Sequence, residues 1–250
     1  MRFSKSKLNT FLSCPRKFWF DYVAKLPREE PEEGPLRIGL DVHSIFEWYY
    51  LQPEAATLSG DVETEMRRIL MGHPLSGLYE RYIENFISYN MDIIDSEGVP
   101  GYLPKNVELS LYDLDLDFIG IMDAVYDTRD GIVIVDYKTG KSAASFEKYE
   151  LEMTLYKVLY EKCTGEEVSY CGIFFPYQGV TRMAKCTDDP FHGPRITSEM
   201  EDSALELLDE VREFVKSAGV ERELYRATPS YLCRFCDRKS ECVDAGMYNI

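Results

Sequence analysis

Two runs of alternating apolar and polar residues lie on either side of a short polar segment in the middle of the chain. The runs read FIGIMDAVYD and IVIVDYK, and the segment between them, Thr128-Arg129-Asp130-Gly131, ends in an Asp-Gly pair. Such a pair between two apolar runs is typical of a β-hairpin. We therefore predict two antiparallel strands within residues 116–141, whose successive side chains point to opposite faces of a sheet.

Apolar residues at helical spacing predict several helices around this hairpin. The expected helices are a segment from Ser4 or Ser6 to Cys14, Ile38–Leu51, Asp61–Met71, Leu78–Ile94, Ser145–Lys162, and a last helix through Lys216 that Ser198 and Glu201 open as a capping box. Further strands are expected at Val107–Tyr112, Val168–Tyr177 and Val180–Cys186. Together these elements predict an α/β fold in which a central mixed sheet is flanked by helices.

Three ionisable residues of the hairpin are expected on one face. Asp136 and Lys138 share a face of the second strand, and Asp123 on the first strand lies opposite or diagonal to Asp136 if the turn has two or four residues. A three-residue or bulged turn would separate them. Buried, unpaired charge costs several kcal/mol, and a divalent cation bound by one or two carboxylates would relieve it. A structural Lys-Asp ion pair beside a surface turn is the alternative, and the hairpin alone does not decide between the two.

The overall charge limits which surfaces of this chain can bind nucleic acid. With 250 residues, 45% of them hydrophobic, the chain can form one full domain, and its net charge of −16 argues against a general polyanion-binding surface. Basic residues gather at 16–17, 138–148 and 234–239, which would leave a basic channel on an acidic body, although a salt-rich cytosol would also favour excess acids. Neither a transmembrane-length apolar window nor a signal peptide is present, so we expect a cytoplasmic protein without membrane contact.

Three of the seven cysteines are closely spaced near the end of the sequence, as Cys233-x2-Cys236-x5-Cys242. In a reducing cytosol this spacing indicates a metal site rather than disulfides. Cys14 is the natural fourth ligand, although a lone cysteine is more often a small buried apolar residue. Four thiolates suit zinc and iron-sulfur clusters alike, so the spacing leaves both possible.

The hairpin carries a motif that resembles a known family. The sequence GIMD, ending at Asp123, followed thirteen residues later by DYK, beginning at Asp136, resembles the PD-(D/E)XK nuclease superfamily and, within it, the RecB-like exonucleases. The resemblance implies a restriction-endonuclease-like core in which Asp123, Asp136 and the backbone carbonyl of Tyr137 bind a catalytic Mg²⁺ or Mn²⁺. It also implies that Lys138 is catalytic.

Two further motifs fit the same resemblance. His43 lies in a predicted helix as Gly39-x-x-x-His43 and would be a metal ligand, whereas a lone histidine there is more often a core residue. Where the family has Gln-x-x-x-Tyr, this chain has Glu152-x-x-x-Tyr156, and Tyr156 is expected beside the scissile strand. We include Glu152 in the catalytic set, where its carboxylate could approach the metal or repel phosphate. Glu108, on the preceding strand, either adds a carboxylate to the site or faces solvent.

The cysteines extend the resemblance to both ends of the chain. The pattern SxSxL followed by Cys14-Pro15, together with the later cysteines, resembles the [4Fe-4S] clasp of CRISPR-associated RecB-like exonucleases and of the AddB-type nuclease domain. This implies a cluster held by Cys14, Cys233, Cys236 and Cys242. We accordingly expect one nuclease domain over residues 1–250. Its expected parts are the clasp (1–26 and 229–245), a helical insertion (53–97) and the nuclease core (105–190).

The resemblance implies metal-dependent cleavage of DNA, exonucleolytic and on single strands, in DNA repair and recombination or in CRISPR spacer acquisition. A helicase or a CRISPR integrase would be the partner. Two alternatives are a non-catalytic iron-sulfur subunit that binds DNA or a helicase, and a zinc-stabilised interaction protein without nuclease function. The intact set of Asp123, Asp136 and Lys138 argues against the first. Cleavage polarity, the number of catalytic metals and the oligomeric state are not predicted.

Overall fold

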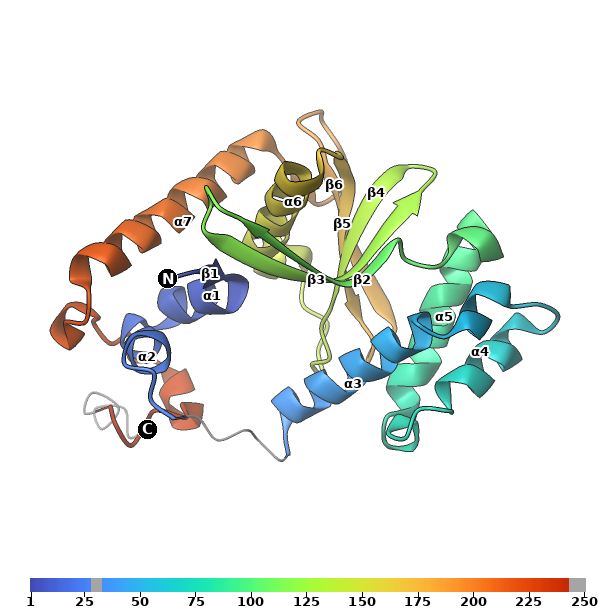
Figure 1. Ribbon diagram of the computed structural model, residues 1–250, viewed down its shortest axis with the longest axis horizontal. Coiled ribbons are helices and arrows are strands. Elements are labelled where there is room, and N and C mark those ends of the chain that lie inside the picture. Colours follow the sequence, from blue (N-terminus) through green and yellow to red (C-terminus); the bar gives the residue numbers. More distant parts are fainter. Residues whose placement is uncertain (28–32, 243–250) are drawn as a thin grey trace.

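Seven strands form one mixed sheet within residues 1–27 and 33–242, the part of the chain that this computed structural model describes (Figure 1). They are β1 Phe3–Ser4, β2 Asn106–Asp113, β3 Phe118–Thr128, β4 Gly131–Tyr137, β5 Val168–Phe175, β6 Val180–Cys186 and β7 Arg195–Ile196. Their order is β1-β3-β4-β5-β6-β7, and β2 pairs with β3 outside this path. The pairs β1–β3, β4–β5 and β6–β7 are parallel, and the others are antiparallel.

The predicted hairpin is formed by β3 and β4, which are antiparallel. Thr128 pairs with Gly131, so the turn contains two residues, and Gly131 has a φ of 104° that glycine adopts without strain. Ile132 and Ile134 pack into the core on one face of the sheet, while Val135 and Tyr137 pack into the core on the other. The predicted alternation is therefore confirmed, and both faces of the hairpin are buried.

Helices cover both faces of the sheet (Figure 1). They are α1 Lys5–Ser13, α2 Pro15–Phe18, α3 Pro35–Tyr50, α4 Val62–Leu70, α5 Glu80–Glu97, α6 Glu150–Thr164 and α7 Ser198–Ala218. The core on one face includes residues of α1, α6 and α7, and the core on the other includes residues of α3, α4 and α5. The predicted α/β class, a central mixed sheet flanked by helices, is confirmed. Each described helix is too short or too polar to span a bilayer.

Several helices begin at other residues than the sequence predicts. α6 begins at Glu150 rather than Ser145, after a 3₁₀ turn over Phe146–Tyr149, and α5 begins at Glu80 rather than Leu78. α3 starts at Pro35 rather than Ile38, because proline is well suited to the first position of a helix. α7 is capped by Thr197, whose hydroxyl accepts from the Met200 N–H at 3.3 Å. The predicted capping box at Ser198 is therefore wrong: the amide and hydroxyl of Ser198 instead donate to the Asp188 carboxylate at 2.8 and 2.9 Å.

The N-terminal helices lie against the last described segment of the chain, at the same end of the molecule (Figure 1). Arg238 is buried, and its guanidinium donates to Asp21 Oδ1 at 2.6 Å and to the carbonyl oxygens of Leu26 and Pro27 at 3.0 and 2.8 Å. Lys17 pairs with the other oxygen of Asp21 at 2.9 Å. Charged groups, and not only apolar packing, thus join the two ends of the described chain.

Candidate functional site

Three carboxylates lie in a row across β2, β3 and β4. The β2–β3 register pairs Val107 with Ala124, which places the next residues, Glu108 and Asp123, opposite each other. Continuing the β3–β4 register by one pair places Asp136 opposite Asp123 on the other side. Asp123 and Asp136 are buried, with 5% and 1% of their surface exposed. The two-residue turn therefore produces the convergence that the sequence left conditional.

His43 reaches this row from α3. Its Nδ1 lies 3.3 Å from Asp123 Oδ1 and 3.6 Å from Glu108 Oε1, and its Nε2 lies 3.2 Å from the carbonyl oxygen of Tyr137. The Tyr137 N–H donates to the second oxygen of Asp123 at 2.5 Å. Ligand atoms of His43, Glu108 and Asp123 all lie within 4.8 Å of one another. One imidazole and two carboxylates at this spacing suit a divalent cation such as Mg²⁺ or Mn²⁺.

The carboxylate of Asp136 is turned toward two lysines instead. Lys138 Nζ lies 2.6 Å from Asp136 Oδ2 and 2.7 Å from Glu152 Oε1. Lys5 Nζ lies 2.6 Å from Asp136 Oδ1 and 2.8 Å from the same Glu152 oxygen. Asp136 thus stands between two groups, the one formed by His43, Glu108 and Asp123 and the one formed by the lysines and Glu152.

The predicted helix motif supplies the second group from α6. Glu152 and Tyr156 are one turn apart, and both are buried. The ammonium of Lys5 lies 5.0 Å from the centre of the Tyr156 ring, within cation–π range. Gly120 of β3 faces Tyr156, and a side chain on Gly120 would come within 3.0 Å of the ring. The absence of a side chain at Gly120 therefore lets α6 bring Glu152 and Tyr156 close to the sheet.

Charges within the site shift its pKa values in different directions. Burial and the neighbouring charge of Asp136 raise the pKa of Asp123 above its usual range. Burial also tends to raise the pKa of Asp136, but the charges of Lys138 and Lys5 outweigh it and keep this pKa below its usual range. Burial lowers the pKa of His43, yet the charge of Asp123 and the bonds to Asp123 and Glu108 raise it to about 10. A bound cation would replace the proton of His43 as the positive charge beside Asp123.

The sequence did not predict that Lys5 belongs to the site. It also left undecided whether Glu108 lies in the site or faces solvent. β1 is only two residues long, so no periodicity in the sequence indicates that it pairs with β3 and brings Lys5 to the site. Glu108 lies in the site with 29% of its side chain exposed, on the side of the carboxylate row away from the lysines. Both placements depend on strand pairing, which is the level of structure that a single sequence predicts least.

The four predicted cluster ligands also lie together. Cys14, Cys233, Cys236 and Cys242 line one small hollow between the two ends of the described chain. The amide of Thr228 points at Cys14 Sγ from 3.5 Å, and the amide of Ser230 points at Cys233 Sγ from 3.4 Å. Four thiols lining one hollow, two of them beside amide donors, are the kind of donor set that binds zinc or an iron-sulfur cluster. Residues 243–245 of the predicted clasp lie outside the described part of the chain.

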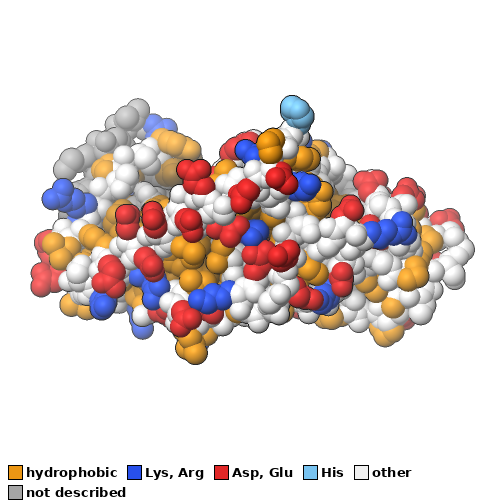
Figure 2. Space-filling view, turned by 90° about the horizontal axis from the view of Figure 1, so that it is seen from above, with side chains coloured by type: hydrophobic (Ala, Val, Ile, Leu, Met, Phe, Trp, Pro, Cys, Tyr) orange, Lys and Arg blue, Asp and Glu red, His pale blue; other side chains and the backbone are white. Residues whose placement is uncertain are grey.

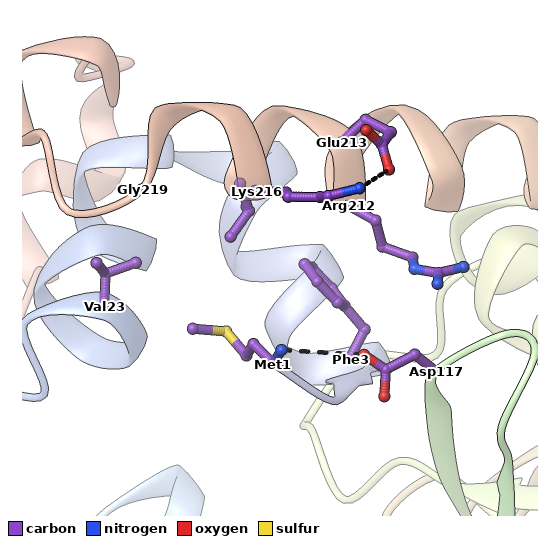
Figure 3. Close-up of a pocket in the computed structure, with 9 residues that line it drawn as sticks. Met1, Phe3, Val23, Asp117, Arg212, Glu213, Lys216 and Gly219 are labelled. Atoms are coloured by element: carbon purple, nitrogen blue, oxygen red, sulfur yellow. Dashed lines mark hydrogen bonds and ion pairs between the residues drawn. The ribbon is translucent and has the colours of Figure 1, made fainter.

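A separate hollow of about 370 Å³ lies between β1, α7 and the turn before β3 (Figure 3). It is lined by Met1, Phe3, Asp117 and Lys216 among others, and its lining includes none of the predicted site residues. On the face shown in Figure 2, acidic and basic side chains are interspersed, and no separate basic channel is visible there. These surfaces therefore add nothing to the predicted nucleic-acid site.

A curled mixed sheet flanked by helices, with carboxylates and lysines meeting at its centre, is the arrangement of restriction-endonuclease-like proteins. The family model of the PD-(D/E)XK nuclease superfamily matches residues 2–243, and the chain belongs to this superfamily, as predicted. Membership fits the order of Asp123, Asp136 and Lys138 along the hairpin.

Curated relatives match shorter segments of the chain. It is 38% identical over 68 residues to an ATP-dependent helicase/nuclease subunit of Alkaliphilus oremlandii (strain OhILAs), a match that covers 24% of this chain and 6% of that protein. It is 30% identical over 113 residues to the protein of the same name from Thermoanaerobacter sp. (strain X514), covering 37% and 9%. The matched segments thus span less than a tenth of these relatives' length.

Proposed function

We propose that this protein is a deoxyribonuclease that depends on a divalent cation and degrades single-stranded DNA from an end. The observation that carries the proposal is the convergence of His43, Glu108 and Asp123, from α3, β2 and β3, directly beside Asp136 and Lys138. A member of a nuclease superfamily with this set of side chains has what phosphodiester hydrolysis requires: ligands for a cation, and a lysine next to them.

The proposed metal ligands are His43, Asp123, Asp136 and the carbonyl of Tyr137, and Glu108 is added from the structure. When bound, Mg²⁺ or Mn²⁺ polarises the phosphate and lowers the pKa of a coordinated water. The chain's own residues then have distinct tasks. Lys138 opposes the negative charge that develops on the phosphate and can orient the attacking water. Asp136, kept ionised by its lysine neighbours, is ready to act as a ligand without first losing a proton.

For the four cysteines we propose a [4Fe-4S] cluster that joins residues 1–26 to 229–245. The four cysteines line one hollow, and zinc bound by four thiolates is the alternative. The order of one early and three later cysteines, which resembles the iron-sulfur clasp of RecB-like exonucleases, supports the cluster. We retain 53–97 as a helical insertion and 105–190 as the nuclease core.

We further propose a helicase as the partner, in DNA repair or recombination. The supporting observation is that the matched relatives are named helicase/nuclease subunits. A CRISPR integrase has no such support. A cytoplasmic location agrees with a thiolate cluster, which needs reduced cysteines. A non-catalytic, DNA-binding subunit of a helicase remains the second candidate, because the similarity to those relatives covers only a small part of their length.

Cleavage of end-labelled single-stranded DNA in Mn²⁺ tests the proposal. We expect Lys138→Ala and Asp136→Ala to lower the cleavage rate by about 100-fold or more. Lys141→Ala is the matched control, since it removes the same charge from an exposed position soon after β4 and should leave the rate unchanged. Circular single-stranded DNA should resist the enzyme if it needs a free end.

Equal cleavage by wild type and Lys138→Ala would mean that a contaminant cuts the DNA, and the enzyme proposal would fail. It would also fail if the wild type does not cleave. Fluorescence anisotropy with the same DNA would then test the second candidate, which predicts binding without cleavage.

A further inference from the structure

The topology of the sheet brings Lys5 to the site. β1 pairs with Phe118 and Ile119 at the start of β3, and β4 pairs with residues 124–128 at its end. Because β2 occupies the other edge of β3, β1 and β4 lie on the same edge. β1 runs parallel to β3 and β4 runs antiparallel, so the two strands point toward each other. Lys5 directly follows β1, and Asp136 lies near the end of β4.

Backbone and side-chain contacts fix the N-terminal segment beside β3. The Phe3 N–H donates to the carbonyl oxygen of Asp117 at 2.8 Å, and the Phe3 ring stacks on Phe18 with 6.1 Å between centroids. Figure 3 shows Phe3 pointing toward α7, with Asp117 beside it. Ser4 caps α1, and Lys5 is the first residue of that helix. The position of Lys5 is therefore fixed by both backbone pairing and core packing.

Two lysines and two carboxylates balance one another's charge in this group: Lys5, Lys138, Asp136 and Glu152. Each lysine contacts both carboxylates at 2.6–2.8 Å, and the two lysines contact different oxygens of Asp136. The carboxylates are 1% and 7% exposed. Without Lys5 the group would carry a net negative charge, with Glu152 next to the place where a phosphate must bind. A buried carboxylate there would repel the phosphate and weaken binding.

We propose that Lys5 is a positioning residue of the nuclease site, which neutralises Glu152 and holds Asp136 so that Lys138 can act on the phosphate. This inference rests on the proposed nuclease function. The ammonium of Lys5 lies 2.6 Å from Asp136 and 2.8 Å from Glu152, which is close enough for it to neutralise one carboxylate while it holds the other. The site is consequently complete only when the N-terminal segment is docked on β3.

A set of five variants tests this role: Lys5→Met, Lys5→Arg, Glu152→Gln, Lys5→Met with Glu152→Gln, and Lys7→Met. Lys7 is the matched control because it lies on the same helix, carries the same charge and donates to the Arg2 carbonyl oxygen outside the site. The first measurement is the affinity for a fluorescein-labelled single-stranded DNA in EDTA, by anisotropy. The second is kcat and KM for cleavage of that DNA in Mn²⁺.

We expect Lys5→Met to weaken DNA binding about tenfold and to lower kcat about tenfold or more, because an unbalanced carboxylate faces the phosphate and Asp136 loses one of its anchors. Lys7→Met should stay within about twofold of wild type. Adding Glu152→Gln to Lys5→Met should restore binding, because the negative charge that Lys5 balanced is then gone. Lys5→Arg should keep the affinity that Lys5→Met loses.

The inference is overturned if Lys5→Met behaves like Lys7→Met in both measurements, or if Glu152→Gln does not restore DNA binding. If Lys5→Met does not fold, the double variant decides, since it buries no unbalanced charge: binding near wild type supports the inference, and a tenfold loss overturns it. A wild type that binds DNA without cleaving it would defeat the proposed function, while the binding series would still decide the role of Lys5.

Discussion

Each buried charged residue at the site is stabilised by an opposite charge beside it. Asp136 and Glu152 lie beneath Lys5 and Lys138, and each of these side chains would be costly to bury alone. Removing one partner leaves a charge without compensation, whereas removing an opposite pair can be nearly neutral. Variants of this site should therefore be interpreted as pairs, because the effect of one substitution includes the cost to the residues that remain.

At the scale of single residues, we predict that Glu108 is a ligand of the cation. Its φ of 47° is unusual for a residue other than glycine, and such a conformation is held in place by its surroundings. The carboxylate of Glu108 lies beside His43 and Asp123. We expect Glu108→Gln to weaken Mn²⁺ binding about tenfold by calorimetry. Asp127→Asn, which removes an exposed acid from β3, should bind Mn²⁺ like wild type. Equal affinities for the two variants would show that Glu108 is no ligand.

At the scale of elements, β3 organises the site. It pairs with β2 along one edge and with β1 and β4 along the other, and it carries Asp123 between them. α6 packs over the same stretch, with Tyr156 and Leu159 against Gly120. A change at this contact should therefore affect both stability and the position of Glu152 on α6.

Gly120→Ala tests that contact. Its new methyl group would lie 2.8 Å from a methyl carbon of Leu159 and 3.0 Å from the Tyr156 ring, and both side chains are fully packed. We expect the free energy of unfolding to fall by about 1–3 kcal/mol, measured by urea denaturation, with a lower cleavage rate. Gly140→Ala is the control, because nothing lies within 4 Å of its new methyl group. If both variants are as stable as wild type, α6 does not depend on the missing side chain.

The same elements show what the sequence could and could not predict. Period-two alternation predicted that Asp123 and Asp136 share a face only if the turn has two or four residues, and the two-residue turn of the structure meets this condition. Lys5 could not be predicted in this way, since β1 is too short to show a pattern and its partner is far along the chain. The cap of α7 was misplaced by one residue because Thr197 and Ser198 are both good caps, and only Asp188 distinguishes them.

At the scale of the whole molecule, α1 connects the two proposed cofactor sites. Lys5 is its first residue, and Cys14 follows its last. Cys14 lies in the hollow with the three later cysteines, so a cluster there would hold one end of α1 and Lys5 would hold the other. Arg238 adds its bonds to Asp21 nearby. Loss of the cluster should therefore lower overall stability, and it should also displace Lys5 from the nuclease site because α1 is no longer held at Cys14.

Cys236→Ser tests this connection, with Cys163→Ser as control because Cys163 is an exposed cysteine of α6. In protein purified without oxygen, we expect Cys236→Ser to lose the visible absorption and iron of the wild type. Its Tm should fall by at least about 5 °C, since a domain of this size loses about 2–4 °C for each kcal/mol and metal binding of this kind contributes more than that. Below that temperature its affinity for single-stranded DNA should drop toward that of Lys5→Met, because a loosened α1 no longer holds Lys5 beside Glu152. Zinc in place of iron in the wild type would exclude the cluster, and unchanged DNA affinity in folded Cys236→Ser would show that α1 does not link the two sites.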